Sequence, residues 1–587
     1  MPHITKVLEE NQEAATFRDM LRRLESEHDG QRNPVIRGFT FPDLSQTLAI
    51  YDIPVQAFVH WEFLPFIDDI AEQVKKAAET KDAEGVIYGL HCYKLLQATG
   101  ETLQMLLDYL RMVEYRDDAS EWEARVRYTL RELERVGDAL QQTFAPGITP
   151  ERLWQHPWLP LETIPEDLRA YALQIATNPI FDREKQETAE WHQRMASMEA
   201  REINSAPKDV PGRVSQHRKL RASTLQFDNA YAMQLAECRL SPEEMQYFFF
   251  TASEALAHVE RVGDVIGFHP EQATGDTIRK PSLQTLSDKA EQAVQMLENA
   301  FGYYCDGMRR QLRDIAENNQ ILLLRPDHKG RHDAPASSVP LVPMEGNSGA
   351  VMTFAFFNGS HESIFNLAHE LGHEWHNRKS LELIRHNEAH PYAWMGDNMT
   401  AEFFSLSAEM IVATYILTHP QDPLVSADKI TPDAIALRLF QADYLNIFYG
   451  LLKADFAMRM DLSHSTAEAV EATLKTFHIP EDIQENVSYF VRYSYASNSH
   501  NPYMAVNYTL ARAASRGIFA LCEEITASLP EDAANSLRHA LGEAILREAR
   551  SHTGKSVRDV AENVAQELAP YLSPEQISFS ALCGKGI

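Results

Sequence analysis

The chain has 587 residues with 84 acidic and 55 basic side chains, and its formal net charge at pH 7 is −29. This negative excess argues against nucleic acid and anionic membrane surfaces as partners, because both contacts depend on clustered lysine and arginine. With 44% hydrophobic and 24% charged residues, the composition is that of a globular protein long enough for several domains.

The apolar spacing predicts a mostly α-helical fold. Apolar residues recur every three or four positions at 17–24, 86–110 and 286–315, as on one face of a helix. Strand patterns occur mainly at 320–324 and 350–357. We expect these strands to form a small antiparallel sheet beside the helix that follows residue 357.

Two irregular segments suggest the domain organisation. Prolines between 146 and 165 interrupt the helical pattern, and the polar segment 204–213 contains two further prolines and a glycine. We place a boundary near the second segment, between an N-terminal helical domain at 1–205 and a second domain at 206–587. A third irregular segment, 326–349, directly precedes a strand and is expected to belong to a functional site.

The N-terminus and the cysteines both favour a cytoplasmic protein. The first residues, MPHITKVLEENQEAATF, lack the basic-then-apolar order of a secretory signal, and no apolar run approaches the roughly 20 residues that span a bilayer. The cysteines are odd in number, far apart and without a CxxC pair, so we expect buried thiols rather than disulfides or a cysteine zinc site. They are Cys92, Cys238, Cys305, Cys522 and Cys583.

The segment 358–376 carries the most informative pattern. Asn358 and Gly359 end the strand, Ser360 is a favourable N-cap, and apolar residues at helical spacing follow. Glu362 falls in the first turn, where the helix dipole favours a negative charge. The sequence therefore predicts strand, turn and helix in this order.

Two histidines on this helix have the spacing of metal ligands. His369 and His373 are four residues apart, so their rings lie one turn apart on one face and both can reach one metal ion. Glu370 can act on a metal-bound water without being a ligand. Neutral imidazole suits zinc, and a catalytic zinc site takes three protein ligands and keeps a fourth position for water. This HExxH pattern predicts two ligands and a base.

The third ligand must come from another segment. In the pattern HExxHxxGxxH it would be a histidine at position 379, but the chain has Lys379 there and His376 in place of the glycine, which excludes that class. Because 383–391 is polar and turn-like, we interpret its histidines as residues of the surface or of a channel wall. The downstream candidates are Glu382, Glu388, Glu402, Glu409, His386 and His390.

Glu402 is the best placed of these candidates. The segment 400–417 is largely apolar and predicts a buried helix that carries Glu402 and Glu409 on one face. Buried carboxylates are costly unless they meet a metal, a cation or a hydrogen-bonded histidine. We predict Glu402 as the third ligand and Glu409 as the acceptor for a ligand histidine N–H. Two acids at the solvent edge of a partly exposed helix are the alternative.

These residues resemble the oligoendopeptidase F and thimet oligopeptidase family of zinc metallopeptidases. The similar motifs are Phe357-Asn-Gly-Ser, Leu367-Ala-His-Glu-Leu-Gly-His with His376, and Glu402-x-x-Ser405-x-x-x-Glu409. The gap between His373 and Glu402 is longer than in the family, which suggests an insertion within 378–400. The resemblance implies two helical lobes flanking a deep substrate channel and one Zn²⁺ per chain. We expect Glu409 and His376 to hold the ligands in position.

A tyrosine-rich cluster follows nearer the C-terminus. Five of the 21 tyrosines fall between positions 489 and 508. Amide hydrolysis needs donors aimed at the oxyanion of the tetrahedral intermediate, and tyrosine and histidine can supply them. The family carries such residues in a loop facing the zinc. This resemblance implies His500, Tyr503 and Tyr508 as catalytic residues, with Tyr508 the preferred oxyanion donor. An aromatic helix packed on the core is the alternative.

The motifs predict a zinc peptidase, and the family resemblance implies that it hydrolyses internal bonds of short, unstructured oligopeptides. His369, His373 and Glu402 would hold Zn²⁺, and Glu370 would take a proton from water and deliver it to the leaving amine. The strand at 350–357 could pair with an extended peptide as an added strand.

Nothing in the sequence indicates an oligomeric state. Two alternative functions stay open. A zinc carboxypeptidase of similar architecture would need a positive group for the substrate's terminal carboxylate, and Arg492 and Arg512 flank the tyrosine cluster. The other alternative is a non-catalytic helical peptide-binding protein. Such a protein would need no base beside its histidines, so the presence of Glu370 argues against it.

Overall fold

A computed structural model gives the fold of the chain from Val210 onward. The structure describes residues 210–224, 227–238, 240–266, 283–317, 321–324, 337–341, 350–385, 398–427, 432–443, 447–462, 465–481, 483–497, 504–551 and 556–587, together with Glu72 and Lys76. The N-terminal domain predicted at 1–205 therefore lies outside the described residues apart from those two. The domain boundary stays a prediction.

The predicted mostly helical class is confirmed. Up to the sheet, the helices are α11 (Val210–Thr224), α12 (Ala230–Cys238), α13 (Pro242–Ile266), α14 (Leu283–Tyr304) and α15 (Asp306–Glu317). After the sheet come α16 (His361–Arg385), α17 (Asn398–Thr418), α18 (Pro423–Ala427), α19 (Pro432–Asp443), α20 (Tyr449–Asp461), α21 (Thr466–Thr476) and α22 (Gln484–Ser497). The C-terminal part consists of α23 (Met504–Thr526), α24 (Glu531–Ser551), α25 (Val557–Ala565), the 3₁₀ helix η6 (Gln566–Leu568) and α26 (Phe579–Gly586).

The sheet differs from its prediction in two ways. Its strands β1 (Ile321–Leu324), β2 (Ser337–Leu341) and β3 (Ala350–Phe356) have the order β1-β3-β2. β1 runs parallel to β3 and β2 antiparallel to it, so the sheet is mixed rather than antiparallel. β3 is the central strand with partners on both edges, and the predicted pairing of a peptide with 350–357 is therefore wrong. The strand β2 gives no strand pattern in the sequence, because it is short and contains Pro340, which is tolerated at a sheet edge.

The helix predicted over 286–315 is two helices. Cys305 separates α14 from α15, and α24 crosses at this corner. A Cβ atom added to Gly542 of α24 would lie 2.7 Å from the carbonyl oxygen of Tyr304 and 2.7 Å from Cβ of Cys305. The periodicity continues through the break because both helices bury apolar residues in the same core, so it could not reveal the change of direction.

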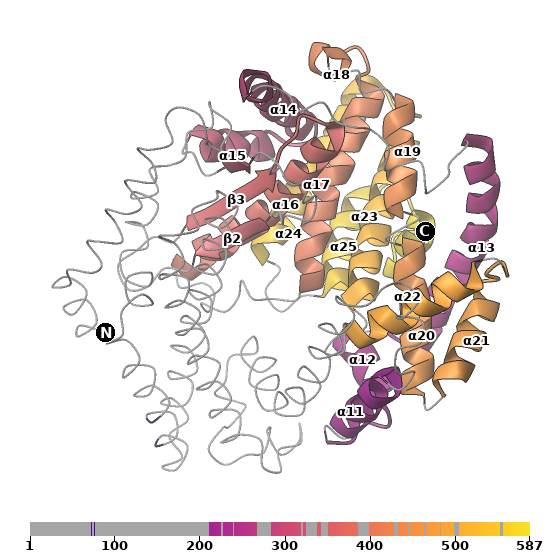
Figure 1. The fold of residues 1–587 in the computed structure, drawn as a ribbon. Coiled ribbons are helices and arrows are strands. Elements are labelled where there is room, and N and C mark those ends of the chain that lie inside the picture. The colour runs from indigo at the N-terminus through magenta and orange to yellow at the C-terminus, as the bar shows by residue number, and fades with distance from the viewer. Residues whose placement is uncertain are drawn as a thin grey trace.

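Three long helices form the centre of the described fold. α16 packs against β3 and β2 on one side and against α17 on the other, and α17 packs in turn against α23 (Figure 1). By length and a mean hydropathy of 1.2, the segment Thr400–Thr418 of α17 meets the criterion for a membrane span, which the sequence analysis did not expect. Since 78% of that segment is buried inside the protein, α17 is a core helix.

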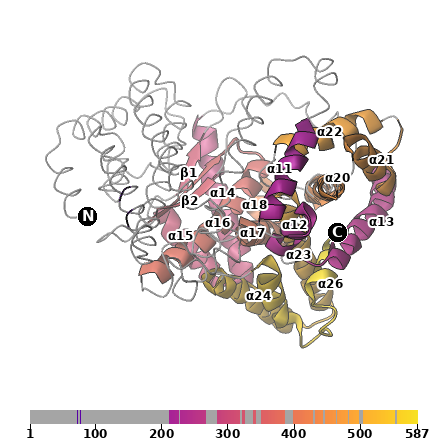
Figure 2. The same cartoon turned by 90° about the horizontal axis from the view of Figure 1, so that it is seen from below.

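A second group of helices surrounds α20. The helix α20 contacts α11, α12, α13, α21 and α22, and Figure 2 shows it end-on among them. Arg218 of α11 is fully buried here and donates to the carboxylate of Asp461 at the end of α20, at 2.9 Å from Nη2. Tyr495 of α22 donates to the same carboxylate at 3.0 Å. This shared carboxylate joins α11 and α22 to α20.

Candidate metal centre

A tight turn between β3 and α16 determines where the metal-site helix begins. Gly359 has a φ of 78°, in the left-handed region that favours glycine. The Ser360 N–H donates to Oδ1 of Asn358 at 2.9 Å, and the Ser363 N–H donates to Oγ of Ser360 at 3.3 Å. Ser360 therefore caps the helix, as predicted, and fixes the register of the histidines along α16.

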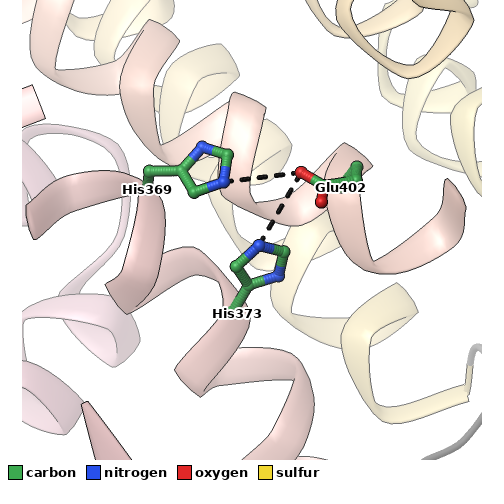
Figure 3. Close-up of side chains that lie close together, drawn as sticks. All are labelled: His369, His373 and Glu402. Carbon is green, nitrogen blue, oxygen red and sulfur yellow. Dashed lines mark ion pairs between the residues drawn. The ribbon is translucent and has the colours of Figure 1, made fainter. Parts of the chain in front are cut away.

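The three predicted metal ligands lie together. Nε2 of His369 is 3.4 Å and Nε2 of His373 is 3.7 Å from Oε2 of Glu402, and one ligand atom from each residue lies within 4.8 Å of the others. All three side chains point into one space between α16 and α17 (Figure 3). A tetrahedral zinc with bonds of about 2.0–2.1 Å separates its ligands by about 3.4 Å. This donor set therefore fits a zinc ion in both chemistry and spacing.

The close approach of α16 and α17 depends on Gly372. A Cβ atom at this position would lie 2.4 Å from Cα of Ser405 and 2.6 Å from the carbonyl oxygen of Phe404. Any side chain would thus collide with the backbone of α17. Gly372 lies one residue before His373, and Ser405 lies one turn after Glu402, so this contact determines the distance between the ligands of the two helices.

Glu402 is held in place by its own helix. Oγ of Ser405 donates to Oε2 of Glu402 at 3.0 Å and to its backbone carbonyl at 2.9 Å. Burial raises the pKa of the Glu402 carboxyl above its ordinary value, although the nearby His369 and the Ser405 hydrogen bond lower it. A carboxylate that burial penalises gains from a neighbouring cation, which is what a metal would supply.

Glu409 makes the contact that the sequence analysis assigned to it. Its Oε1 lies 2.8 Å from Nδ1 of His369, and its Oε2 accepts from Nη2 of Arg438 and Nη2 of Arg512, each at 3.2 Å. Burial alone would raise the pKa of the Glu409 carboxyl, but Arg512, His369 and Arg438 lower it to about 2. Glu409 is therefore ionised at neutral pH and favours Nδ1–H on His369, which leaves Nε2 for the metal.

The two histidines differ electrostatically. Burial and the neighbouring His369 lower the pKa of His373 to about 3, so this imidazole is neutral at pH 7 and can bind a metal. Burial would also lower the pKa of His369, but the hydrogen bond and charge of Glu409 outweigh it and raise the value. A metal ion therefore competes with a proton for Nε2 of His369 as the pH falls.

Glu370 and His376 lie on the same helix as the ligand histidines. The side chain of Glu370 is buried, and its charge contributes to the raised pKa of His369. His376 is also buried and lies against Phe404 of α17, with ring centroids 5.5 Å apart. This contact supports the packing of α16 on α17, and a direct role of His376 in holding the ligands stays a prediction.

Tyr508 belongs to α23 and lies beside the metal centre. Its ring stacks on that of His369, with centroids 6.4 Å apart and an interplanar angle of 30°. Burial and the charge of Glu409 raise the pKa of the Tyr508 hydroxyl, so it stays protonated and can donate at neutral pH.

The rest of the predicted tyrosine cluster is divided. His500 and Tyr503 lie outside the described residues, as do His386, Glu388 and His390. Tyr489 and Tyr493 stack on each other in α22, and the Tyr495 hydroxyl donates to Asp461.

The segment 378–400, predicted to hold an insertion, is helical up to Arg385 and again from Asn398. Residues 383–385 thus extend α16, although they belong to the segment 383–391, which was predicted to be turn-like.

Two arginines at the site were missed or misassigned by sequence reasoning. The sequence pattern does not single out Arg438, and it suggests Arg512 as a partner for a substrate carboxylate. Both arginines lie in apolar helices and are buried. A charge in a buried helix requires a partner, so both arginines could have been recognised as Glu409 was.

Comparisons with known proteins test the fold. No family model matches the chain, and no curated protein matches it. Among solved structures, a chain described as a "putative peptidase from Chlamydophila abortus" aligns with a TM-score of 0.51 at 12% identity, over 86% of this chain and 90% of that one. This chain shares that fold. The resemblance to peptidases predicted from the motif is thereby confirmed at the level of the fold.

Two oligoendopeptidase structures align more loosely. One, described as "putative Oligoendopeptidase F", has a TM-score of 0.49 at 13% identity, over 87% of this chain and 97% of that one. The other, oligoendopeptidase F from Enterococcus faecium, has a TM-score of 0.42 at 12% identity, over 87% and 99% of the two chains.

Proposed function

We propose that this chain is a zinc-dependent endopeptidase that hydrolyses internal bonds of short, unstructured oligopeptides. The observation that carries the proposal is the convergence of His369, His373 and Glu402, with Glu370 directly beside the first ligand. The shared fold with a peptidase structure supports it. A structural zinc site would close its fourth position with a protein ligand and would need no base.

The reaction follows from the roles of the side chains. A bound zinc ion would act as a Lewis acid that polarises the scissile carbonyl and lowers the pKa of the attacking water. Glu370 takes the proton of the attacking water and delivers it to the leaving amine. The Tyr508 hydroxyl donates to the developing oxyanion, and Glu409 keeps the His369 ring oriented throughout.

The proposed substrate class and location rest on less direct support. The acidic net charge of −29 favours cationic or neutral peptides over anionic polymers. A channel between two helical lobes, as in the family that the motif resembles, would restrict access to unstructured peptides. Cys305, Cys522 and Cys583 are free and buried, as predicted, which suits the reducing cytoplasm.

The carboxypeptidase alternative is weakened by the contacts of Arg512. Nη2 of Arg512 is bound to Glu409, and Arg512 is 4% exposed. Arg492 donates from Nε to the backbone carbonyl of Ser488 at 3.0 Å, within its own helix. Arg512 is thus committed to Glu409 and is not arranged as a receptor for a substrate carboxylate.

A pair of matched peptides distinguishes these functions. One oligopeptide carries a free C-terminal carboxylate, and the second has the same sequence with an amidated C-terminus and an acetylated N-terminus. An endopeptidase cleaves both at the same internal bond, as read by mass spectrometry. Cleavage of the free peptide alone, with release of its last residue, would establish the carboxypeptidase instead.

A further inference from the structure

Arg438 of α19 lies buried between two helices of the metal centre. Its Nε donates to Oε2 of Glu362 in the first turn of α16 at 2.8 Å, and its Nη1 and Nη2 donate to Oε2 of Glu409 at 3.3 and 3.2 Å. The guanidinium carbon also lies 3.8 Å from the ring centroid of Phe365. Because Glu362, Phe365 and His369 follow one another at helical spacing, Arg438 covers the two turns of α16 that precede His369.

The two oxygens of Glu409 have separate partners. Oε1 faces Nδ1 of His369, whereas Oε2 accepts from Arg438 and from Arg512. Charge-assisted hydrogen bonds to a planar guanidinium are strong and directional, and they strengthen in a buried environment. Rotation of the Glu409 carboxylate would break them, so the guanidinium contacts at Oε2 determine where Oε1 points.

We propose that Arg438 is a positioning residue for the metal centre, which fixes Glu409 so that the His369 ring presents Nε2 toward His373 and Glu402. The inference rests on the proposed function in one respect, namely that zinc is the ion bound. Arg512 contacts the same oxygen from α23. Arg438 in addition ties that oxygen to the first turn of α16 through Glu362, and thus connects the helices that supply all three ligands.

A buried arginine can also be merely structural, so the test needs a matched control. Arg538 provides one, because it forms a bidentate pair with Glu523, at 3.0 and 2.9 Å, and lies 5.0 Å from the ring centroid of Tyr303. These contacts join α23, α24 and α14. Arg538→Gln therefore removes the same kinds of contact as Arg438→Gln without touching Glu409.

The experiment compares Arg438→Gln, Arg438→Lys and Arg538→Gln in the full chain. The readouts are the zinc dissociation constant from competition with a chromophoric chelator, the visible absorption of the Co²⁺-loaded protein, and urea unfolding of the metal-free protein. We expect Arg438→Gln to weaken zinc binding about 10- to 100-fold, as is found for residues that orient metal ligands. We expect an altered Co²⁺ spectrum as well. Lysine keeps the charge but cannot bridge two carboxylates as the planar guanidinium does. The zinc affinity of Arg438→Lys should therefore lie between those of the native protein and Arg438→Gln.

The outcomes separate this inference from the proposed function. Arg538→Gln should lose stability but keep the zinc affinity and Co²⁺ spectrum of the native protein. If Arg438→Gln also keeps the native zinc affinity and Co²⁺ spectrum, then Arg438 is only structural. Should the glutamine variant not fold, the same result in Arg438→Lys leads to the same conclusion. A native protein that binds no zinc would overturn the proposed function, and this inference with it.

Discussion

Gly372→Ala is the substitution that tests most sharply how the two helices form the site. The added Cβ would lie 2.4 Å from Cα of Ser405, whereas ordinary contacts begin at 3.4 Å, so α16 and α17 must separate by 3.4 − 2.4 = 1.0 Å or distort equivalently. The Nε2 to Oε2 separations are now 3.4 and 3.7 Å. An increase of this size moves them well beyond the roughly 3.4 Å that a tetrahedral zinc requires.

Two measurements follow from this displacement. Overpacking of this kind should lower the free energy of unfolding of the metal-free protein by about 1–3 kcal/mol, as read from urea denaturation. Zinc affinity should fall about 10- to 100-fold in chelator competition, the range found when ligands lose their positioning.

Gly542→Ala is the matched control for this substitution. Its Cβ would lie 2.7 Å from the carbonyl oxygen of Tyr304, at the contact of α24 with the end of α14 and not at that of α16 with α17, so the variant should lose stability but keep native zinc affinity. Native zinc affinity in Gly372→Ala would refute the reasoning, because the spacing of α16 and α17 would then not control the site.

Three further predictions concern individual side chains. Glu402→Ala should lose more zinc affinity than the 10- to 100-fold expected for supporting residues, as measured by chelator competition. If Glu402→Ala instead keeps its zinc affinity and Glu388→Ala or His390→Ala loses it, another residue is the third ligand. Tyr508→Phe should lower kcat about 10²–10³-fold with little change in KM, since the hydroxyl acts on the oxyanion; unchanged kcat would remove Tyr508 from the mechanism. Because the pKa of Glu409 is lowered from 4.5 to about 2, its contribution to stability is present above pH 4.5 and is lost as the pH falls toward 2. Acid titration of unfolding in the metal-free protein should show this loss, and Glu409→Gln should flatten it; an identical slope in the variant would contradict the assignment.

Much of the site could be predicted because its chemistry is local to two helices. The four-residue spacing of His369 and His373 places both rings on one face wherever the helix lies. Glu402 and Glu409 are carboxylates in an apolar segment, where burial without partners is unfavourable. The approach of α16 and α17 could not be predicted this way, because nothing in the sequence specifies that Gly372 would meet the backbone of Ser405.

The fold was predictable in class but not in topology. Helical periodicity reports burial of one face, and it runs through the corner at Cys305 because α14 and α15 share one core. The central position of β3 depends on β2, whose Pro340 and serines give no strand signal. A partner for Arg438 could be expected from its apolar helix, but not which one, because Glu362 and Glu409 are distant from it in sequence and meet it only in the folded protein.

The central claim is that Glu370 acts as the base beside a zinc ion held by His369, His373 and Glu402. Its most direct test is cleavage of a quenched oligopeptide library by the native protein and by Glu370→Gln, with zinc content measured on the same samples. We predict near-stoichiometric zinc in both proteins and a loss of activity in the variant of at least about 10²-fold, as expected for removal of a general base. Native-like cleavage by Glu370→Gln at equal zinc content would contradict the account.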